Sequence, residues 1–182
     1  MSRLFFSITI LYASMFFVGC QRTDVTPAKQ QPGPDNGMLT VRNQDGVLVN
    51  DIGIATFATP QGWQPLRSDG STAIIIGRPN ATPANSEEMI TIDVGAPIEN
   101  TVQKSAIAVA SKFSGRSSKM DLVIDGEEAY QVVIPPDYKK LKPRHCIVVH
   151  HGDRVLYIFG GSKSTNDIWS PVMEIARSLK WK

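Results

Sequence analysis

Apolar and polar residues recur along this chain with two different periods, and each period predicts a type of secondary structure. From Met89 to Val94 every second residue is aliphatic, which is the spacing of a strand with one buried face. The segment from Thr72 to Gly77 is apolar on both faces, as in a strand covered on two sides. Asp51 to Thr59 is predicted to be a single strand. The polar, proline-containing segment from Arg78 to Glu88 is predicted to be a long surface loop.

Two other stretches follow the 3.6-residue period of an amphipathic helix. The first begins near Asn100, which together with Gln103 resembles a capping box, and it ends at Gly115. Its apolar face is formed by Val102, Ala106, Val109, Ala110 and Phe113. The second begins near Asn166 and has Pro171 in its first turn. Its apolar face is formed by Trp169, Val172, Ile175, Ala176 and Leu179.

Two hairpins are indicated by their turn residues. The segment from Asp125 to Glu128 joins two short strands, and Gly152-Asp153 suits a two-residue type II′ turn because glycine stands first, where φ must be positive. The second turn predicts the pairs His151 with Arg154, Val149 with Leu156, Ile147 with Ile158, and Val148 with Tyr157. Both faces of that pair are apolar, so we expect it to be central and covered on both sides.

Two helices and about seven strands predict an α+β domain, in which an antiparallel sheet of six or seven strands packs with two main helices as an α/β/α sandwich. The composition is that of a globular domain, with 42% hydrophobic and 20% charged residues. The net charge is only +2, and no stripe of Lys and Arg follows a helix. Both observations argue against a nucleic-acid partner.

The N-terminal segment carries a targeting signal. An apolar run from Leu4 to Val18 follows Arg3 and ends at a glycine followed by Cys20. About fifteen residues suit a secretory signal rather than a bilayer span of about twenty. The end of the run resembles the lipobox of bacterial lipoproteins, Leu-small-small-Cys, with Phe17 in place of leucine. The resemblance implies cleavage before Cys20 and acyl chains on that residue. An ordinary signal peptide cut nearby and an uncleaved anchor are the alternatives.

Three segments are therefore predicted: residues 1–19 as a lipoprotein signal peptide, 20–37 as the lipidated cysteine and a flexible tether, and 38–182 as a single domain. The tether is rich in proline and polar residues and cannot bury enough apolar surface to become ordered. If Cys20 carries lipid, Cys146 has no cysteine partner, and we interpret it as a buried, unreactive thiol. We expect the protein in the cell envelope, anchored to a bacterial membrane and facing the periplasm or the exterior.

Three motifs follow one another along the chain: Phe57-x-x-Pro60-x-Gly62-Trp63, then Gly126-x-x-x-Tyr130, then Tyr157 ahead of a final helix ending Ser178-Leu179-Lys180. Their order resembles that of PsbP-type and Mog-type α/β/α sandwiches, a group that includes the extrinsic photosystem II subunit and many bacterial lipoproteins. The resemblance covers roughly residues 50 to 182. It implies a sandwich fold and docking on partner proteins, and it transfers no catalytic residue.

The three histidines do not form a metal-binding pattern. His150 and His151 are neighbours on a predicted strand and point to opposite faces, whereas His145 and His151 lie about 20 Å apart on one face. The sequence also lacks HExxH and paired CxxC motifs. We therefore predict no metal site and no cofactor.

The signals for catalysis are weak. The stretch Gly160-Gly161-Ser162-Lys163-Ser164 lacks the last glycine of a GxSxG nucleophile elbow, so we interpret it as a helix entry with a capping hydroxyl. A serine-based hydrolase stays open as an alternative. Acidic residues cluster around one hairpin and are interpreted as solvated carboxylates: Asp121, Asp125, Glu127 and Glu128.

A basic segment is the one candidate contact outside the lipid anchor. It consists of Tyr138, Lys139, Lys140, Lys142 and Arg144. Its simplest interpretation is a solvated loop that keeps a strand edge soluble. The alternative is a contact for an acidic protein surface or for anionic lipid.

Three classes of function remain. The first is a lipid-anchored, extracytoplasmic accessory or binding module, non-catalytic and docking on a partner protein. The second is a small-ligand carrier, which a deep apolar pocket would favour. The third is an enzyme, which a hydrogen bond between Ser162 and a histidine would favour.

Overall fold

The computed structural model describes residues 40–44, 47–66, 73–82, 85–136, 143–164 and 166–182. Within them the chain forms helix α1 (Val102–Lys112), helix α2 (Trp169–Ser178) and eleven strands. In chain order the strands are β1 (Thr40–Gln44), β2 (Val47–Asp51), β3 (Ala55–Ala58), β4 (Gln64–Leu66), β5 (Ile74–Gly77), β6 (Glu88–Gly95), β7 (Arg116–Ile124), β8 (Glu127–Val133), β9 (Pro143–His151), β10 (Arg154–Ser162) and β11 (Lys180–Trp181). No helix of this described part is long and apolar enough to span a bilayer.

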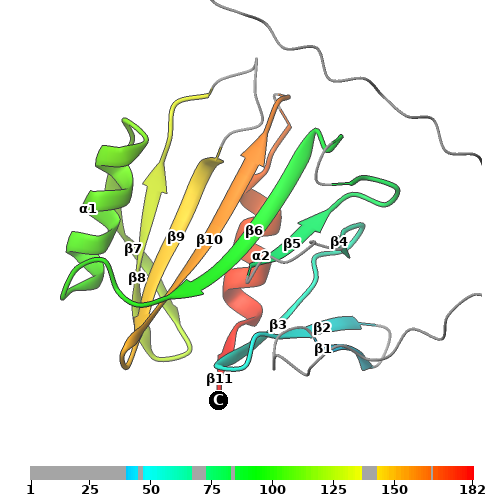
Figure 1. The fold of residues 1–182 in the computed structure, drawn as a ribbon, viewed down its shortest axis with the longest axis horizontal. Helices are drawn as coiled ribbons and strands as arrows, with labels where there is room; N and C mark the ends of the chain where they lie inside the picture. The colour runs from blue at the N-terminus through cyan, green and yellow to red at the C-terminus, as the bar shows by residue number, and fades with distance from the viewer. Residues whose placement is uncertain (1–39, 45–46, 67–72, 83–84, 137–142, 165) are drawn as a thin grey trace, which may run out of the picture. The chain divides into compact units, whose positions relative to one another are not determined.

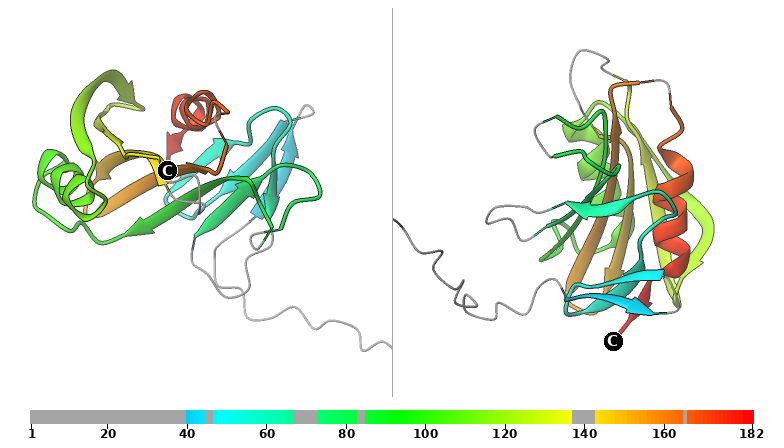
Figure 2. Two further views of the ribbon diagram at one scale, coloured as in Figure 1. Left: turned by 90° about the horizontal axis from the view of Figure 1, so that it is seen from above. Right: turned by 90° about the vertical axis from the view of Figure 1, so that its right-hand side faces the viewer.

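The strands form two antiparallel sheets. The larger sheet has seven strands in the order β4-β5-β6-β10-β9-β8-β7, and the smaller has the order β1-β2-β3-β11. Helices α1 and α2 lie on opposite faces of the larger sheet, as Figures 1 and 2 show. The predicted fold class, an α+β sandwich with a sheet of about seven strands and two main helices, is confirmed.

The hairpin of β9 and β10 forms the centre of the sheet, with all four predicted residue pairs in register. Gly152 has a φ of 58° and Asp153 does not have a positive φ, as a type II′ turn requires. Leu156 and Ile158 pack into the core beneath α2, whereas Val148 and Tyr157 pack into the core beneath α1. The central hairpin is therefore covered on both faces, as expected from its two apolar faces.

Gly160 has a packing role that the sequence alone did not reveal. It lies inside β10, and a Cβ atom added to it would be 2.6 Å from a methyl group of Val172 on α2 and 3.0 Å from Ile168. Such distances are too short for a real side chain, so glycine is what allows α2 to pack closely on β10. The prediction of a helix entry at residues 160–164 is wrong for Gly160 to Ser162, because these residues belong to β10 and pair with β6, and the two glycines also pair with β9.

Two strand predictions were also wrong. The segment Asp51 to Thr59 is not one strand: it bends at Gly53, whose φ is 84°, and β2 pairs with β3 as an antiparallel hairpin. The final helix ends at Ser178, and Lys180 and Trp181 extend as β11 along β3. A strand of two residues is too short to leave a periodic pattern, and only its partner strand defines it.

The element boundaries moved by a few residues. Thr101, not Asn100, caps α1: its Oγ1 accepts a hydrogen bond from the Lys104 amide at 3.2 Å. The second helix begins at Trp169, three residues later than predicted. The first hairpin turns through only two residues, Asp125 and Gly126, whose φ values of 47° and 96° match a type I′ turn.

Candidate functional site

Most of the residues predicted to carry lipid or to contact a partner lie outside the described residues: Cys20, Tyr138, Lys139, Lys140 and Lys142. Arg144 is described and lies in β9, half-buried. Its Nη1 donates a hydrogen bond to the Ser164 carbonyl at 3.0 Å, which ties β9 to the segment that leads into α2. The contact role of the basic segment stays a prediction.

The three histidines occupy three different environments. His145 packs on the first residue of α2, with ring centroids 5.0 Å apart. His150 Nε2 lies 3.0 Å from the Ser105 hydroxyl of α1, and the His151 ring stacks on Trp181 with centroids 4.4 Å apart. In the part of the chain that the structure describes, no three His, Cys, Asp or Glu side chains lie close enough together to hold a metal ion.

The two candidate nucleophiles are both buried. Ser162 is part of β10, and the hydrogen bonds of its hydroxyl among the described residues are all with Ser164. The arrangement therefore lacks the histidine contact that would favour a serine hydrolase. Cys146 is fully buried, and this burial raises the pKa of its thiol well above the ordinary value. Its predicted burial is confirmed, and at neutral pH the sulfur stays in the unreactive thiol form.

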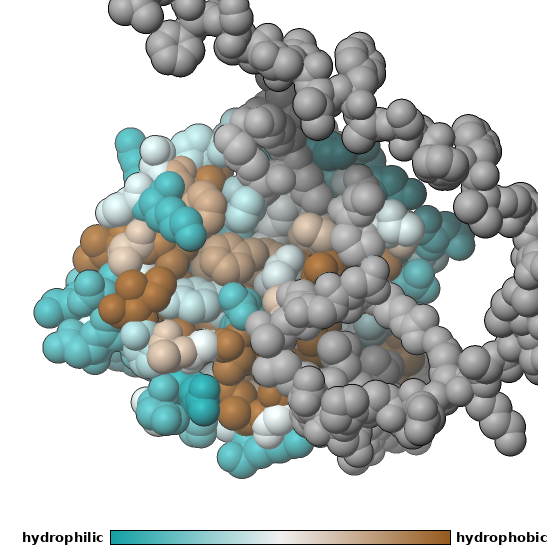
Figure 3. Space-filling model, viewed as in Figure 1, coloured by the Kyte–Doolittle hydropathy of each residue, from teal (hydrophilic) through white to brown (hydrophobic). Residues whose placement is uncertain are grey.

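A groove runs between α1 and the exposed part of the neighbouring strands β6 and β10, and we call it the α1 groove. Its volume is about 500 Å³. Apolar side chains gather in the middle of the face shown in Figure 3, with hydrophilic side chains around them. The groove is lined by Thr91, Asp93, Ile98, Ala108, Val109, Lys112, Phe113, Pro143, Tyr157 and Phe159.

Strand register gives this groove two chemically different ends. Tyr157 pairs with Asp93 across β10 and β6, and Phe159 pairs with Thr91. Because side chains two residues apart on a strand share a face, these four form the floor in two rows. The row of Tyr157 and Asp93 is polar. It lies nearer the loop before α1, because the backbone of Ile98 in that loop is close enough to the Tyr157 hydroxyl to affect the pKa of the phenol.

The other end of the α1 groove is aromatic. The Phe113 ring meets the Phe159 ring edge-on, with centroids 6.3 Å apart, and the Phe159 ring stacks on that of Tyr157 at 5.8 Å. The Lys112 ammonium lies 5.5 Å from the Phe113 ring centroid, which is a cation–π contact. Three rings thus form a continuous apolar surface from one end of the groove to the other.

Two polar side chains line the polar end of the groove. Tyr157 is 7% exposed, and its hydroxyl is buried beside the backbone of Ile98. Burial raises the pKa of this phenol, and the Ile98 backbone has a smaller, opposite effect. Asp93 is half-buried and forms no ion pair with the described residues, so its carboxylate keeps contact with the groove and with solvent.

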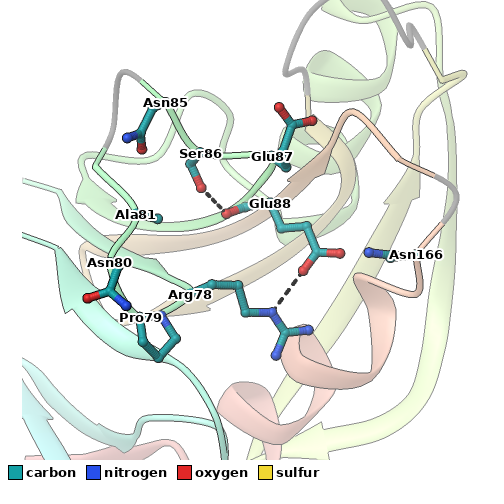
Figure 4. Close-up of a pocket in the computed structure, with 9 residues that line it drawn as sticks. All are labelled: Arg78, Pro79, Asn80, Ala81, Asn85, Ser86, Glu87, Glu88 and Asn166. Carbon is teal, nitrogen blue, oxygen red and sulfur yellow. Dashed lines mark hydrogen bonds and ion pairs between the residues drawn. The ribbon is translucent and has the colours of Figure 1, made fainter.

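A second, more polar pocket of about 490 Å³ lies where β5 ends and β6 begins (Figure 4). Arg78 Nε donates to Glu88 Oε2 at 2.9 Å, and the Arg78 guanidinium lies 4.4 Å above the Trp63 ring. The other oxygen of Glu88 has no partner among the described residues. In Figure 4 the Glu88 carboxylate lies between Arg78 and Asn166.

The described residues from Arg78 to Glu88 form a mostly exposed loop, as predicted, but two of them are buried. The Glu88 side chain is only 4% exposed and belongs to β6, and Ser86 is buried with its hydroxyl bonded to the Glu88 carbonyl. The ion pair closes the end of the β5–β6 pair against Trp63. We therefore assign Arg78 and Glu88 a structural role.

The carboxylates around the first hairpin are not simply solvated. Asp125 accepts hydrogen bonds from Lys180 Nζ at 3.0 Å and from the Trp181 amide at 2.8 Å, and the bond from Lys180 lowers the pKa of its carboxyl. Glu127 lies 3.0 Å from His151 Nδ1, and Glu128 pairs with Lys119. The contacts of Asp125 tie the hairpin to the C-terminal strand β11, and that of Glu127 ties it to β9, whereas Asp121 is exposed as predicted.

The sequence did not identify the α1 groove. The alternation along β6 correctly placed Thr91 and Asp93 on the face opposite the buried isoleucines. The turn at Gly152 correctly placed Tyr157 in the central hairpin. The sequence did not predict the pairing of β6 with β10. This pairing brings Asp93 beside Tyr157, although the two residues are far apart in the chain.

No protein-family model and no curated protein matches this sequence. Among solved structures, a crystal structure of a protein from Bacteroides thetaiotaomicron is similar with a TM-score of 0.49 and 9% sequence identity over 75% of this chain. The chain spans about half of that protein, 48%. The solution structure of cyanobacterial PsbP (CyanoP) from Synechocystis is similar with a TM-score of 0.45 and 13% identity, over 86% of this chain and 100% of that one. Similarity at this level does not establish a family or transfer a function, so membership in a PsbP-type or Mog-type family stays a prediction.

Proposed function

We propose that this protein is a lipid-anchored, non-catalytic binding module that docks on a partner protein through the α1 groove. The observation that carries the proposal is an apolar groove whose rim includes Ile98, a large side chain with 60% of its surface exposed. Ile107, on the outer side of α1, is 48% exposed. Apolar side chains that stay in water next to a preformed groove are typical of interaction sites.

The position of the module in the cell is also a proposal, supported by the lipobox resemblance at Cys20. Two or more acyl chains would hold the chain stably on a bacterial membrane, facing the periplasm or the exterior. Replacing Cys20 with Ser should abolish incorporation of a palmitate analogue and leave an uncleaved precursor. Equal labelling of the wild-type and variant proteins would refute the anchor.

The docking surface is tested by photo-cross-linking in intact cells. A benzoyl-phenylalanine placed at Lys112, an exposed residue that lines the α1 groove, should give a discrete protein adduct. The same group at Glu174, which is exposed on α2 on the opposite side of the sheet, is the matched control. Ile98→Asp should remove the adduct from position 112 without changing stability by more than about 0.5 kcal/mol, because Ile98 is exposed. Equal adducts at both positions, or an adduct indifferent to Ile98→Asp, would contradict docking at this groove.

We propose the basic segment as a second contact, made to an acidic surface of the same partner. Replacing Lys139, Lys140, Lys142 and Arg144 with Gln should weaken recovery of the cross-linked partner at low salt. The loss should shrink as salt rises, because exposed charges are screened over about 8 Å at physiological ionic strength. Unchanged recovery at low salt would return the segment to a solvated loop.

A small-ligand carrier is the second candidate function, and one observation favours it. The α1 groove has a volume of about 500 Å³. Pockets that bind small molecules are typically of roughly 300–1,000 Å³, largely apolar and supplied with a few convergent polar groups. The Asp93 carboxylate and the Lys112 ammonium, whose residues line the groove, are such groups.

A further inference from the structure

The polar end of the α1 groove carries one negative charge that the described protein leaves uncompensated. Asp93 is half-buried, lines the groove, forms no ion pair with any described residue and pairs with Tyr157 in the strand register. A carboxylate in such partly desolvated surroundings attracts a cation more strongly than one in water. It also disfavours an anionic ligand.

Among the described residues, one cation lines the groove, and it lies at the other end. Lys112 is four residues, about one helical turn or 5.4 Å, beyond Ala108, and its ammonium is placed over Phe113. Phe113 contacts Phe159, which is two residues along β10 from Tyr157, a spacing of roughly 7 Å. Lys112 therefore leaves the carboxylate of Asp93 available to a ligand.

The rings between the two ends suit the body of such a ligand. The faces of Tyr157, Phe159 and Phe113 form one apolar surface, and aromatic faces attract organic cations through their quadrupoles. The contact of Lys112 with Phe113 shows that a ring of this groove already accommodates an ammonium group.

We propose that the α1 groove binds a small organic ammonium ion with an apolar body. The charged nitrogen donates to the Asp93 carboxylate, and the body lies against the Phe159 ring. The inference rests on the carrier role proposed above and names the chemistry of its ligand.

Three probes of matched shape test the charge requirement with the full-length chain: 2-phenylethylamine, which is protonated at pH 7, neutral 2-phenylethanol and anionic phenylacetate. Calorimetric titration gives the affinity, and NMR shifts of the Tyr157 and Phe159 rings locate the site. We expect the amine to bind at least about tenfold more tightly than the alcohol, since a charge-assisted contact exceeds a neutral one by about that factor. Phenylacetate should bind more weakly than the alcohol.

Four variants assign the effect to individual groups. Asp93→Asn should remove the preference for the amine, whereas Asp93→Glu keeps the charge and should keep most of that preference. Tyr157→Phe keeps the ring and should change amine binding by less than about twofold, because the hydroxyl that it removes is covered by protein. Lys112→Met should strengthen it by about twofold, because a like charge is removed. Asp121→Asn, an equal change of charge at an exposed site outside the groove, is the control and should have no effect. Unfolding midpoints of all variants are measured to confirm that each one folds.

The outcomes separate this inference from the carrier role. Tighter binding of phenylacetate than of the amine, or an amine preference that survives Asp93→Asn, overturns the cation inference. If ring shifts in the groove still accompany binding of the alcohol, the carrier role stands. The absence of shifts with all three probes overturns both.

Discussion

Burial determines the chemistry of several single side chains in this domain. Cys146 lies in the core beneath α1, and burial raises the pKa of its thiol. His145 and His150 are partly buried, and loss of hydration lowers the pKa of both imidazoles from their ordinary value of 6.5, with the charge of Arg144 adding to the effect at His145. In each case the neutral form is favoured, because a charge is costly away from water.

Cys146 should resist alkylation in the native protein. Iodoacetamide reacts with thiolates that are exposed to solvent. Cys146 is buried, and its raised pKa keeps the sulfur in the thiol form at pH 8. Mass spectrometry should find Cys146 unmodified in buffer and fully modified in guanidinium chloride. The same experiment examines the anchor, because a lipidated Cys20 stays unlabelled in denaturant. Rapid native labelling of Cys146 would contradict its burial.

Stability should fall as the pH decreases below about 6.5. The folded chain binds protons at His145 and His150 at lower pH than the unfolded chain does, so protonation favours unfolding. The urea midpoint should therefore be lower at pH 5.0 than at pH 7.5. Asp125 and Asp167 do not contribute in this window, since hydrogen bonds from Lys180 and Ser170 lower the pKa of their carboxyls below the ordinary 3.8.

The matched control for the pH effect is a double variant, His145→Phe with His150→Gln. It carries no titrating group at the two positions, so its urea midpoint should change less between pH 7.5 and pH 5.0 than that of the wild type. An equal decrease in both proteins would show that other groups cause the pH dependence.

At the scale of elements, short connections determine where strands and helices end. The β7–β8 hairpin turns through Asp125 and Gly126, both with positive φ, and helix α1, which ends at Lys112, is followed by Ser114 with a φ of 55°. The side-chain cap of α1 is Thr101, one residue after the expected asparagine. Both are cap-forming residue types, so local chemistry alone does not decide between such neighbours.

Gly126→Ala should destabilise the domain by about 1–2 kcal/mol, because an L-residue with a side chain is strained at a φ of 96°. Gly95→Ala is the matched control. A Cβ atom would meet no atom within 4 Å at either glycine, but Gly95 does not have a positive φ. Urea unfolding should therefore show a clear decrease only for Gly126→Ala. Equal decreases would indicate that φ is not the cause.

At the scale of the whole molecule, the last three residues join the two sheets. Trp181 pairs with β3 of the smaller sheet, while its ring stacks on His151 of the larger sheet. The amide of Lys182 donates to the Ile54 carbonyl at 3.0 Å, and its ammonium pairs with Asp51. The C-terminus thus connects parts of the chain that lie far apart in the sequence.

Deleting residues 180–182 should lower the free energy of unfolding by about 2 kcal/mol or more, since a half-buried indole and its backbone pairing are lost. Lys182→Gln is the control. It removes only an ion pair at the surface and should cost no more than about 1 kcal/mol. Urea unfolding measures both. A truncated chain as stable as the wild type would show that β11 does not hold the sheets together.

The sequence by itself determined the features that depend on nearby residues. The register of β9 with β10 follows from one glycine turn and the alternation on either side of it, and the faces of both helices follow from their spacing. The lipid anchor at Cys20 is likewise predicted from a local motif and stays a prediction. Turn chemistry and periodicity act over a few residues, so the sequence displays them directly.

Only the tertiary structure decided the features that join distant segments. Pairing of β6 with β10 creates the α1 groove, pairing of β3 with β11 converts the end of the predicted helix into a strand, and the contact of α2 with β10 gives Gly160 its role. The energy of such contacts comes from burial between surfaces that meet only in the folded chain, and a one-dimensional pattern does not specify which surfaces meet.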